Sequence, residues 1–387
     1  MERWTGHSQA SSHAQNWVLE ESDPDTWAPL DAAPDATQLM QRARQLQAAA
    51  RASTTKKSYA HWWRVFAEFC VELQWARNCE AVPLPVPANL VVMWVAWLSE
   101  RYAESTISVS LAAISVVHSS HGLQAPTGGP QIRAMLEAVA RTGKVRGVEE
   151  QVVVTPEHIK AFVRLQSAWS EEGSRWSDLR LARAKAMVCL GFMAYLRKSE
   201  VGALDRCDVW RAVECTKVRV CKAKNDPVGR GRVTIVGAAC GDSREVESTI
   251  WRWIELAGLS VSSQCSKSLD PRGRCAACGP LFPRLAGRNV HASRSAIGKS
   301  TLTTELRGLF SSAQRSGLLA ASIDPRRFSA ISLRRGGNSA AAAAGVSSLL
   351  RAAHGRWRAV ETPDQSYTFM HQAKMVALAT TMLAPSL

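Results

Sequence analysis

The sequence has no apolar run long enough to cross a membrane. Its longest uninterrupted apolar stretch, residues 186–196, has 11 residues, whereas a membrane-spanning helix needs roughly 18 or more. The residues that follow Met1 also lack the apolar segment of a secretion signal. These absences argue against a membrane-spanning or secreted protein, and we expect an intracellular protein with no membrane partner.

The ten cysteines do not form the repeated pairs that a disulfide framework or a structural zinc site would require. Cys275 and Cys278 make a single CxxC pair, and Cys240, Cys265 and His291 lie close enough in sequence to suggest zinc. Because no second pair accompanies the first, the pattern favours free cysteines in a loop insertion. We therefore expect no bound metal and no other cofactor.

Tyrosine is scarce, since the 387 residues include only Tyr59, Tyr102, Tyr195 and Tyr367. The first two fit the faces of predicted N-terminal helices, and Tyr195 lies within the apolar run. Tyr367 follows a Pro-containing segment, residues 360–364, that favours a loop. It is therefore the one tyrosine whose sequence context predicts exposure.

Acidic residues are outnumbered, with 33 Asp and Glu against 48 Lys and Arg, so the net charge is +15 and the pI is about 9.7. The charge is also uneven, because residues 1–35 carry seven acids and one base, which leaves +21 on residues 36–387. Such an excess is typical of proteins that bind a polyanion, although charge alone does not distinguish DNA, RNA and acidic membranes.

Length and composition predict two globular domains and a tail. The chain is too long for one ordinary core, and its 46% hydrophobic and 21% charged residues are typical of folded proteins. Residues 1–35 mix Ser, Asp, Pro and Ala, which predicts a flexible acidic tail. A polar stretch before residue 150 and the helix-start signal Thr-Pro-Glu at 155–157 place a boundary between domains 36–148 and 149–387.

Residues 36–148 predict a small helical bundle, with helices after Ser53 and over 90–102, 104–118 and 130–142. Aromatic residues recur at helical spacing between Tyr59 and Phe69, and we expect this stripe to form core rather than a platform for stacked bases. The candidates for phosphate contacts are the basic residues Lys56, Lys57, Arg101, Arg133 and Arg141.

Residues 149–387 predict a mainly α-helical domain with a small β-hairpin. The predicted helices cover 156–169, 174–198, 244–257, 299–316, 335–353 and 366–383. The alternating, β-branched segments 218–221 and 232–236 flank turn-forming residues, which predicts the hairpin. Residues 260–298 are rich in Ser, Gly, Pro and Cys, which predicts a long loop insertion.

The apolar run ends in Arg197-Lys198-Ser199-Glu200, at the end of a predicted buried helix. Glu200 lies three residues after Arg197 and can hold its guanidinium on the same helical face. Two interpretations remain open at this point: a structural ion pair, or an arginine positioned to bind two phosphate oxygens.

Two further segments carry residues suited to phosphate chemistry. Arg334 and Arg335 follow Ile331 at the start of an Ala-rich helix, where backbone amides also favour anions. The sequence His-Gly-Arg-Trp at 354–357 then precedes Tyr367, which lies ten residues beyond the tryptophan.

Taken in chain order, these features resemble the tyrosine recombinase (phage integrase) family over roughly residues 36–387. The resemblance implies a two-domain architecture, with a helical, SAM-like core-binding domain before the catalytic domain. It also implies that Arg197 and Arg334 are the two catalytic arginines and that Glu200 is the acidic companion of the first. Arg335 and His354 would support them.

The same resemblance assigns the remaining catalytic positions. Lys224, with Lys222 as the fallback, resembles the lysine of the family's hairpin, Trp357 fits the late His-or-Trp position, and Tyr367 fits the nucleophile. There are two departures. Ile331 replaces the histidine of the family's His-x-x-Arg segment and has no polar atom, and the interval from Trp357 to Tyr367 is one or two residues longer than usual.

The resemblance implies a site-specific DNA recombinase or integrase of a mobile element, which cleaves and rejoins strands through a 3′-phosphotyrosyl intermediate without metal or ATP. Its implied partners are double-stranded DNA and further copies of itself, as a tetramer on paired sites. It would be found with DNA, in the nucleus of a eukaryotic host and otherwise in the cytoplasm. The alternatives are a degenerate recombinase that binds DNA without cutting it, a topoisomerase-like relaxing enzyme, and a helical RNA-binding protein.

Overall fold

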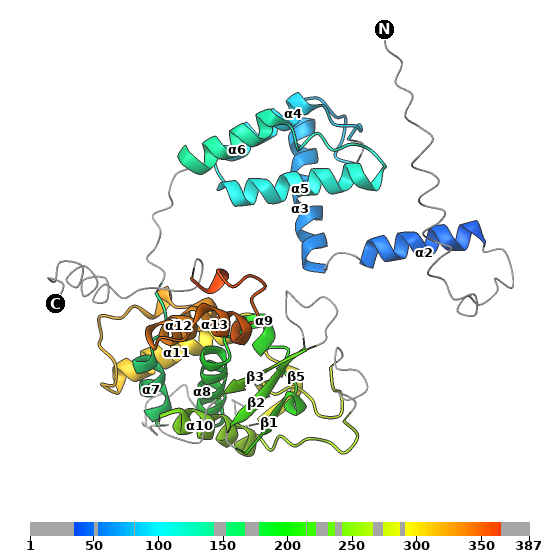
Figure 1. Cartoon of the computed structure of the whole chain (residues 1–387). Coiled ribbons are helices and arrows are strands. Elements are labelled where there is room, and N and C mark those ends of the chain that lie inside the picture. The colour runs from blue at the N-terminus through cyan, green and yellow to red at the C-terminus, as the bar shows by residue number, and fades with distance from the viewer. Residues whose placement is uncertain are drawn as a thin grey trace, which may run out of the picture. The chain divides into compact units, whose positions relative to one another are not determined.

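The computed structural model describes residues 35–49, 53–80, 82–142, 152–166, 178–213, 215–221, 231–236, 242–265, 274–286 and 291–364. The chain divides between Gly147 and Val148 into two compact units, each with its own hydrophobic core (Figure 1). The predicted tail, apart from Asp35, and the predicted helix over 366–383 lie outside the described residues. Among the helices in these ranges, none has the length and apolar character needed to cross a membrane.

The first unit is helical, and its elements are α2 (Ala36–Ala49), α3 (Ser53–Glu72), α4 (Ala88–Ser99), α5 (Glu104–Ser120) and α6 (Pro130–Thr142). Helix α3 packs on α5, and α6 packs on both α4 and α5. Phe66 and Trp94 are fully buried between them, in an edge-to-face contact with ring centroids 5.3 Å apart. The prediction that the aromatic stripe forms core is therefore confirmed.

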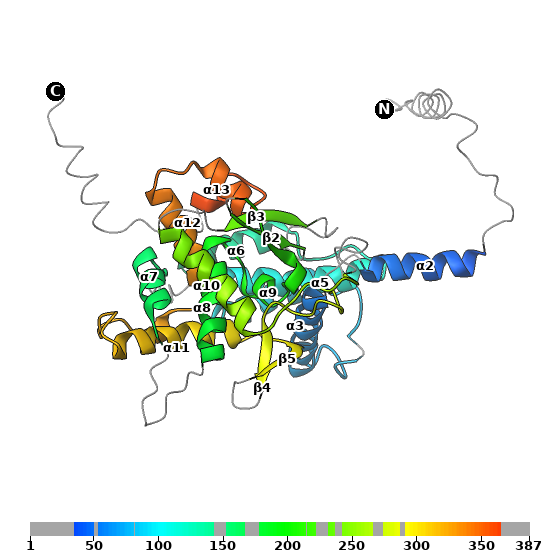
Figure 2. The same ribbon diagram turned by 90° about the horizontal axis from the view of Figure 1, so that it is seen from below.

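The second unit is built around one buried helix. Its helices are α7 (Pro156–Arg164), α8 (Asp178–Met193), α9 (Lys198–Val201), α10 (Asp242–Leu256), α11 (Thr301–Arg315), α12 (Ala330–Ala343) and α13 (Ser348–Gly355). Helix α8 packs against α7, α10, α11 and α12, as Figures 1 and 2 show from two directions. Burial on nearly all sides explains why residues 186–196 are uninterruptedly apolar.

Two small antiparallel sheets complete the second unit. Strands β1 (Val209–Arg211), β2 (Thr216–Val220) and β3 (Arg232–Val236) follow one another in the first sheet, with Val218 paired to Thr234. The predicted hairpin is thus confirmed, and β1 was not predicted. Strands β4 (Pro283–Ala286) and β5 (His291–Ala296) form the second sheet. The prediction of a long loop over 260–298 is therefore wrong for these two strands. The strand signal of β4 is weak, because β4 is only four residues long and begins at a proline.

Two predicted helices are interrupted where the site is built. Helix α8 ends at Met193, and Tyr195 then adopts a left-handed backbone with φ of 49° before α9 begins. The helix predicted over 335–353 is likewise two helices, α12 and α13, separated at Gly345 with φ of 80°. A glycine in this conformation ends a helix, and the hydroxyl of Ser347 then accepts from the backbone N–H of Leu350 to start the next one.

Candidate active site

Arg197 and Glu200 are paired through the start of a helix rather than along one. Arg197 precedes the first turn of α9, and Glu200 occupies the third position of that turn. One carboxylate oxygen of Glu200 accepts the backbone N–H of Arg197 at 2.9 Å, and the other accepts its Nη1 at 2.7 Å. The predicted ion pair is confirmed, and the prediction of a continuous helix through residue 198 is wrong.

Glu200 also binds two arginines from the end of the second unit. Its Oε2 lies 3.1 Å from Nη2 of Arg356 and 3.9 Å from Nη1 of Arg334. The side chain of Glu200 is 1% exposed, so a single buried carboxylate holds three guanidinium groups. We call Glu200, Arg197, Arg334 and Arg356 the arginine cluster.

Arg356 is the member of the cluster that the sequence did not single out. It lies in the His-Gly-Arg-Trp segment, but nothing in its spacing from Glu200 signals the contact. Burial is the main influence on the Arg356 side chain and lowers its pKa, while Glu200 raises the pKa in opposition. Such a buried cation requires an anionic partner, and Glu200 provides it.

Arg334 is fully buried in this structure. Its Nη2 donates to the carbonyl of Gly355 at 2.6 Å, its Nη1 donates to the carbonyl of Tyr195, and its guanidinium lies 4.3 Å from the ring centroid of Trp357. The small Gly337 lets α12 approach the end of α8 closely, since a Cβ there would collide with the carbonyl of Phe192. The predicted second arginine is therefore brought into the cluster, but it lies beneath Trp357.

Two residues of the site have a left-handed backbone that bulky side chains rarely adopt, Tyr195 and Arg356, with φ of 49° and 59°. This conformation of Tyr195 points its carbonyl at Arg334 and at Nη2 of Arg356, the latter at 3.3 Å. Strained backbone of this kind persists where the surrounding structure determines it and is common at functional sites.

Arg197 is the member of the cluster that reaches solvent. Its side chain is 20% exposed, compared with 0% for Arg334 and 3% for Arg356. Glu200 occupies its Nη1, and no described residue bonds its Nε or Nη2. The guanidinium is thus held on one edge and available on the other, which is the arrangement needed to bind two oxygens of a phosphate.

His354 connects the three-stranded sheet to the cluster. Its Nε2 lies 2.7 Å from the carbonyl of Met193, and its Nδ1 lies 3.1 Å from the hydroxyl of Thr234 on β3. Because a carbonyl accepts only, Nε2 carries the proton and Nδ1 accepts from the threonine. Burial lowers the pKa of His354 most, the bond to the carbonyl of Met193 raises it in opposition, and Arg356 and Arg334 lower it, so the pKa lies below its ordinary value.

The structure describes some of the remaining predicted site residues but not all of them. Ile331 lies in the first turn of α12 and is 39% exposed, so it is not part of the core. Arg335 is half-buried beside Arg334 on the same helix. The predicted hairpin lysines, Lys224 and Lys222, and the predicted nucleophile, Tyr367, lie outside the described residues.

The predicted phosphate-contacting residues of the first unit are all exposed. Lys56, Lys57 and Arg133 point to solvent. Arg101 lies over the ring of Trp97 at 4.6 Å from its centroid. Arg141 forms a 3.4 Å ion pair with Glu137.

Comparison with known proteins identifies the fold. No family model and no curated protein sequence matches the chain. Among solved structures, a Tyr-to-Phe variant of the Tn1549 transposon integrase in complex with transposon right-end DNA is 14% identical and has a TM-score of 0.52, covering 88% of this chain and 98% of its own. An Arg-to-Lys variant of the same integrase, in complex with a circular-intermediate DNA, is 13% identical with a TM-score of 0.51, covering 90% and 98%. The chain therefore has a tyrosine recombinase-like fold.

Proposed function

We propose that this protein cleaves and rejoins DNA strands as a tyrosine-type recombinase or integrase. The observation that carries the proposal is the arginine cluster, in which Glu200 holds three arginines and leaves one edge of Arg197 open. A cluster of buried positive charge with one accessible guanidinium suits a phosphodiester, whose negative oxygens repel a nucleophile unless cations neutralise them.

In the proposed reaction, Arg197 binds the non-bridging oxygens of the scissile phosphate. Arg334, whose Nη1 and Nη2 are held by the carbonyls of Tyr195 and Gly355, adds its positive charge from beneath. Tyr367 loses its phenolic proton to water and attacks the phosphorus, a 3′-phosphotyrosyl bond forms, and the bond to the 5′ oxygen breaks. Lys224 protonates that oxygen as general acid, and the freed 5′ hydroxyl of another strand later displaces the tyrosine.

The proposal includes the partners of such a reaction. Exchange between paired sites requires several active sites at once, so the protein would act as a homo-oligomer on double-stranded DNA, as a tetramer when two sites are joined. Because double-stranded DNA is its proposed substrate, we also propose that the protein is found with DNA in the cell.

A second function is favoured by one specific observation. Ile331 occupies the position of the family's histidine and has no group that can donate to a phosphate oxygen. A protein that binds DNA through its basic surface without cutting it would tolerate this residue. The covalent protein–DNA adduct distinguishes the two functions, because a protein that binds DNA without cutting it forms none.

We expect Arg197→Ala to reduce adduct formation by about 100-fold or more, the usual cost of removing a group that stabilises transition-state charge. The substrate is a nicked duplex selected by the protein from random-sequence DNA. Lys198→Ala is the matched control, since Lys198 is adjacent and exposed but outside the cluster. Equal adduct yields from Arg197→Ala and wild type would remove Arg197 from the site.

We expect DNA binding to weaken steeply with salt, because each neutralised phosphate releases counterions and residues 36–387 carry +21. For six to ten contacts, affinity falls by about 10³ to 10⁵ between about 50 and 200 mM salt. Fluorescence anisotropy on a labelled duplex measures this loss.

The double variant Lys56→Gln, Lys57→Gln should make the negative slope of log affinity against log salt shallower, by about 2 units in magnitude. Arg64→Gln on the same helix is the control, because Arg64 already faces Glu68 at 3.9 Å. An affinity that does not change with salt would contradict a phosphate-dominated interface.

A further inference from the structure

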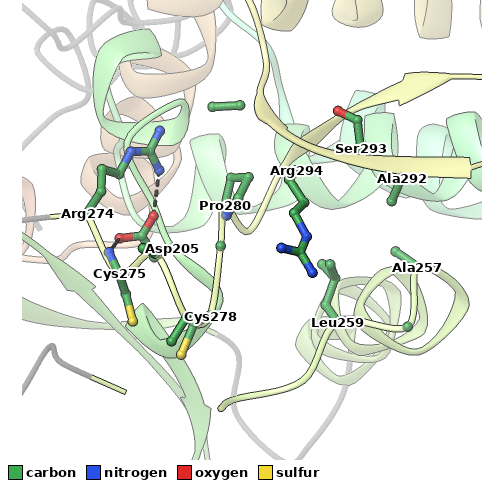
Figure 3. A pocket seen from close by; sticks show the side chains of 15 residues that line it. Asp205, Ala257, Leu259, Arg274, Cys275, Cys278, Pro280, Ala292, Ser293 and Arg294 are labelled. Carbon is green, nitrogen blue, oxygen red and sulfur yellow. Dashed lines mark hydrogen bonds and ion pairs between the residues drawn. The ribbon is translucent and has the colours of Figure 1, made fainter. Parts of the chain in front are cut away.

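Four cysteine side chains of the second unit converge on one point. The sulfur atoms of Cys207, Cys265, Cys275 and Cys278 all lie within 4.8 Å of one another. They come from three separate segments: the 3₁₀ turn before β1, the chain after α10, and the CxxC loop before β4. Figure 3 shows two of them, Cys275 and Cys278, with their sulfur atoms pointing in the same direction.

The spacing of the sulfur atoms matches a tetrahedral metal site. Four thiolates at about 2.3 Å from a zinc ion are about 3.8 Å from one another along each edge of the tetrahedron. The sulfur atoms of Cys265 and Cys275 are 3.7 Å apart. A disulfide would bring two sulfurs to about 2.05 Å, so Cys265 and Cys275 are spaced as two ligands of one ion would be and not as a disulfide.

Backbone contacts hold the ligand-bearing segments together independently of any ion. Asp205 pairs with Pro280 as an isolated bridge, the N–H of Arg206 donates to the carbonyl of Gly279 at 3.0 Å, and that of Leu281 donates to Leu204 at 2.9 Å. The carboxylate of Asp205 accepts the N–H of Cys275 at 2.8 Å. The cysteines are thus positioned by the fold.

Positive side chains lie beside the four cysteines, as a site with four thiolates would require. Arg206 directly precedes Cys207 in the chain, and its guanidinium donates to the carbonyls of Leu259 and Val209 at 3.2 and 2.7 Å. Arg274 binds Asp205 at 2.7 Å on the other side of the CxxC loop. A divalent ion with four thiolates has a net charge of −2; Arg206 offsets part of this charge, whereas the charge of Arg274 is already paired with Asp205.

We propose that Cys207, Cys265, Cys275 and Cys278 bind one zinc ion. Four sulfur ligands leave no open position for substrate, so the site is structural. It joins the chain after α10 to the 3₁₀ turn Arg206–Asp208, which four residues separate from α9, the helix that carries Glu200. The zinc therefore stabilises the scaffold of the arginine cluster. This inference does not depend on the proposed function.

The test is the metal content of the full-length protein, purified with a reducing agent and without chelators, by inductively coupled plasma mass spectrometry. We expect about one zinc ion per chain. Cys207→Ser and Cys278→Ser should each reduce it below about one tenth, because structural affinity requires all four ligands. Cys215→Ser is the matched control, a half-buried cysteine outside the cluster, and should retain the zinc.

A second measurement covers the case in which the serine variants do not fold. Wild-type protein is stripped with a chelator and titrated with Co²⁺, whose tetrahedral thiolate complexes absorb visible light. One equivalent of cobalt should saturate these bands. Wild type without zinc and without cobalt bands would overturn the proposal, as would iron in place of zinc or disulfides among the four cysteines in reducing buffer.

Discussion

The Tyr367→Phe variant is expected to form no covalent protein–DNA adduct while retaining its fold and its affinity for DNA. Phenylalanine lacks only the oxygen that would attack the phosphorus. The phenol has an ordinary pKa of about 10, so it must lose its proton during attack, and in the proposed reaction the guanidinium groups that bind the phosphate would favour the phenolate. The adduct is measured as a labelled band that migrates with the protein in denaturing gels, on the selected nicked duplex.

The described structure supports the choice of Tyr367 by fixing the chain that leads to it. Asn338, one helical turn after Arg334 on α12, donates to the carbonyl of Pro363 at 3.1 Å. Arg351 binds the carboxylate of Asp364 at 2.6 Å. Three residues of extended chain span at most about 11 Å, so the Cα atom of residue 367 lies within about that distance of the Cα atom of Asp364.

The other tyrosines provide the comparison. Burial raises the pKa of Tyr195 to about 12, and its side chain is 6% exposed, which makes it a poor nucleophile. Tyr102 is 43% exposed in the first unit, so Tyr102→Phe is the matched control and should form the adduct normally. An adduct from Tyr367→Phe, or none from wild type on any duplex, would refute the catalytic proposal and leave the DNA-binding alternative.

The Glu200→Gln variant is expected to destabilise the second unit by about 3 to 5 kcal/mol, the usual cost of leaving a buried charge uncompensated. Glutamine preserves the shape of the side chain but removes the negative charge that Arg197, Arg334 and Arg356 share. Arg334 and Arg356 are too deeply buried for water to replace that charge.

Hydrogen exchange of peptides from α8 and α12 in the full chain measures this loss, because exchange reports the opening free energy of each region separately. Arg326→Gln is the control in the same unit. It removes one partner of the Arg326–Asp324 pair, whose arginine is 88% exposed, and should change stability by at most about 1 kcal/mol. If Glu200→Gln also changed the stability by at most about 1 kcal/mol, Glu200 would not be neutralising the arginine cluster.

The sequence by itself determined the elements whose signals are local. Periodic apolar residues predicted the helices of the first unit, alternation predicted the β2–β3 hairpin, and the three-residue interval predicted the ion pair between Arg197 and Glu200. The first two predictions hold because backbone periodicity determines which nearby side chains share a face. The ion pair forms across the start of α9 and depends on the short separation of the two residues. The order of motifs also led to the tyrosine recombinase-like fold.

Only the tertiary structure decided which distant residues meet. Glu200 reaches Arg356 across 156 positions, and Cys207 joins a CxxC pair about seventy residues later. The break after α8 was equally hidden, because Tyr195 adopts its left-handed backbone only where the carbonyl can accept from two buried arginines. Local spacing encodes the path of the backbone over a few turns, whereas the charges and thiols that come together depend on how the helices pack around α8.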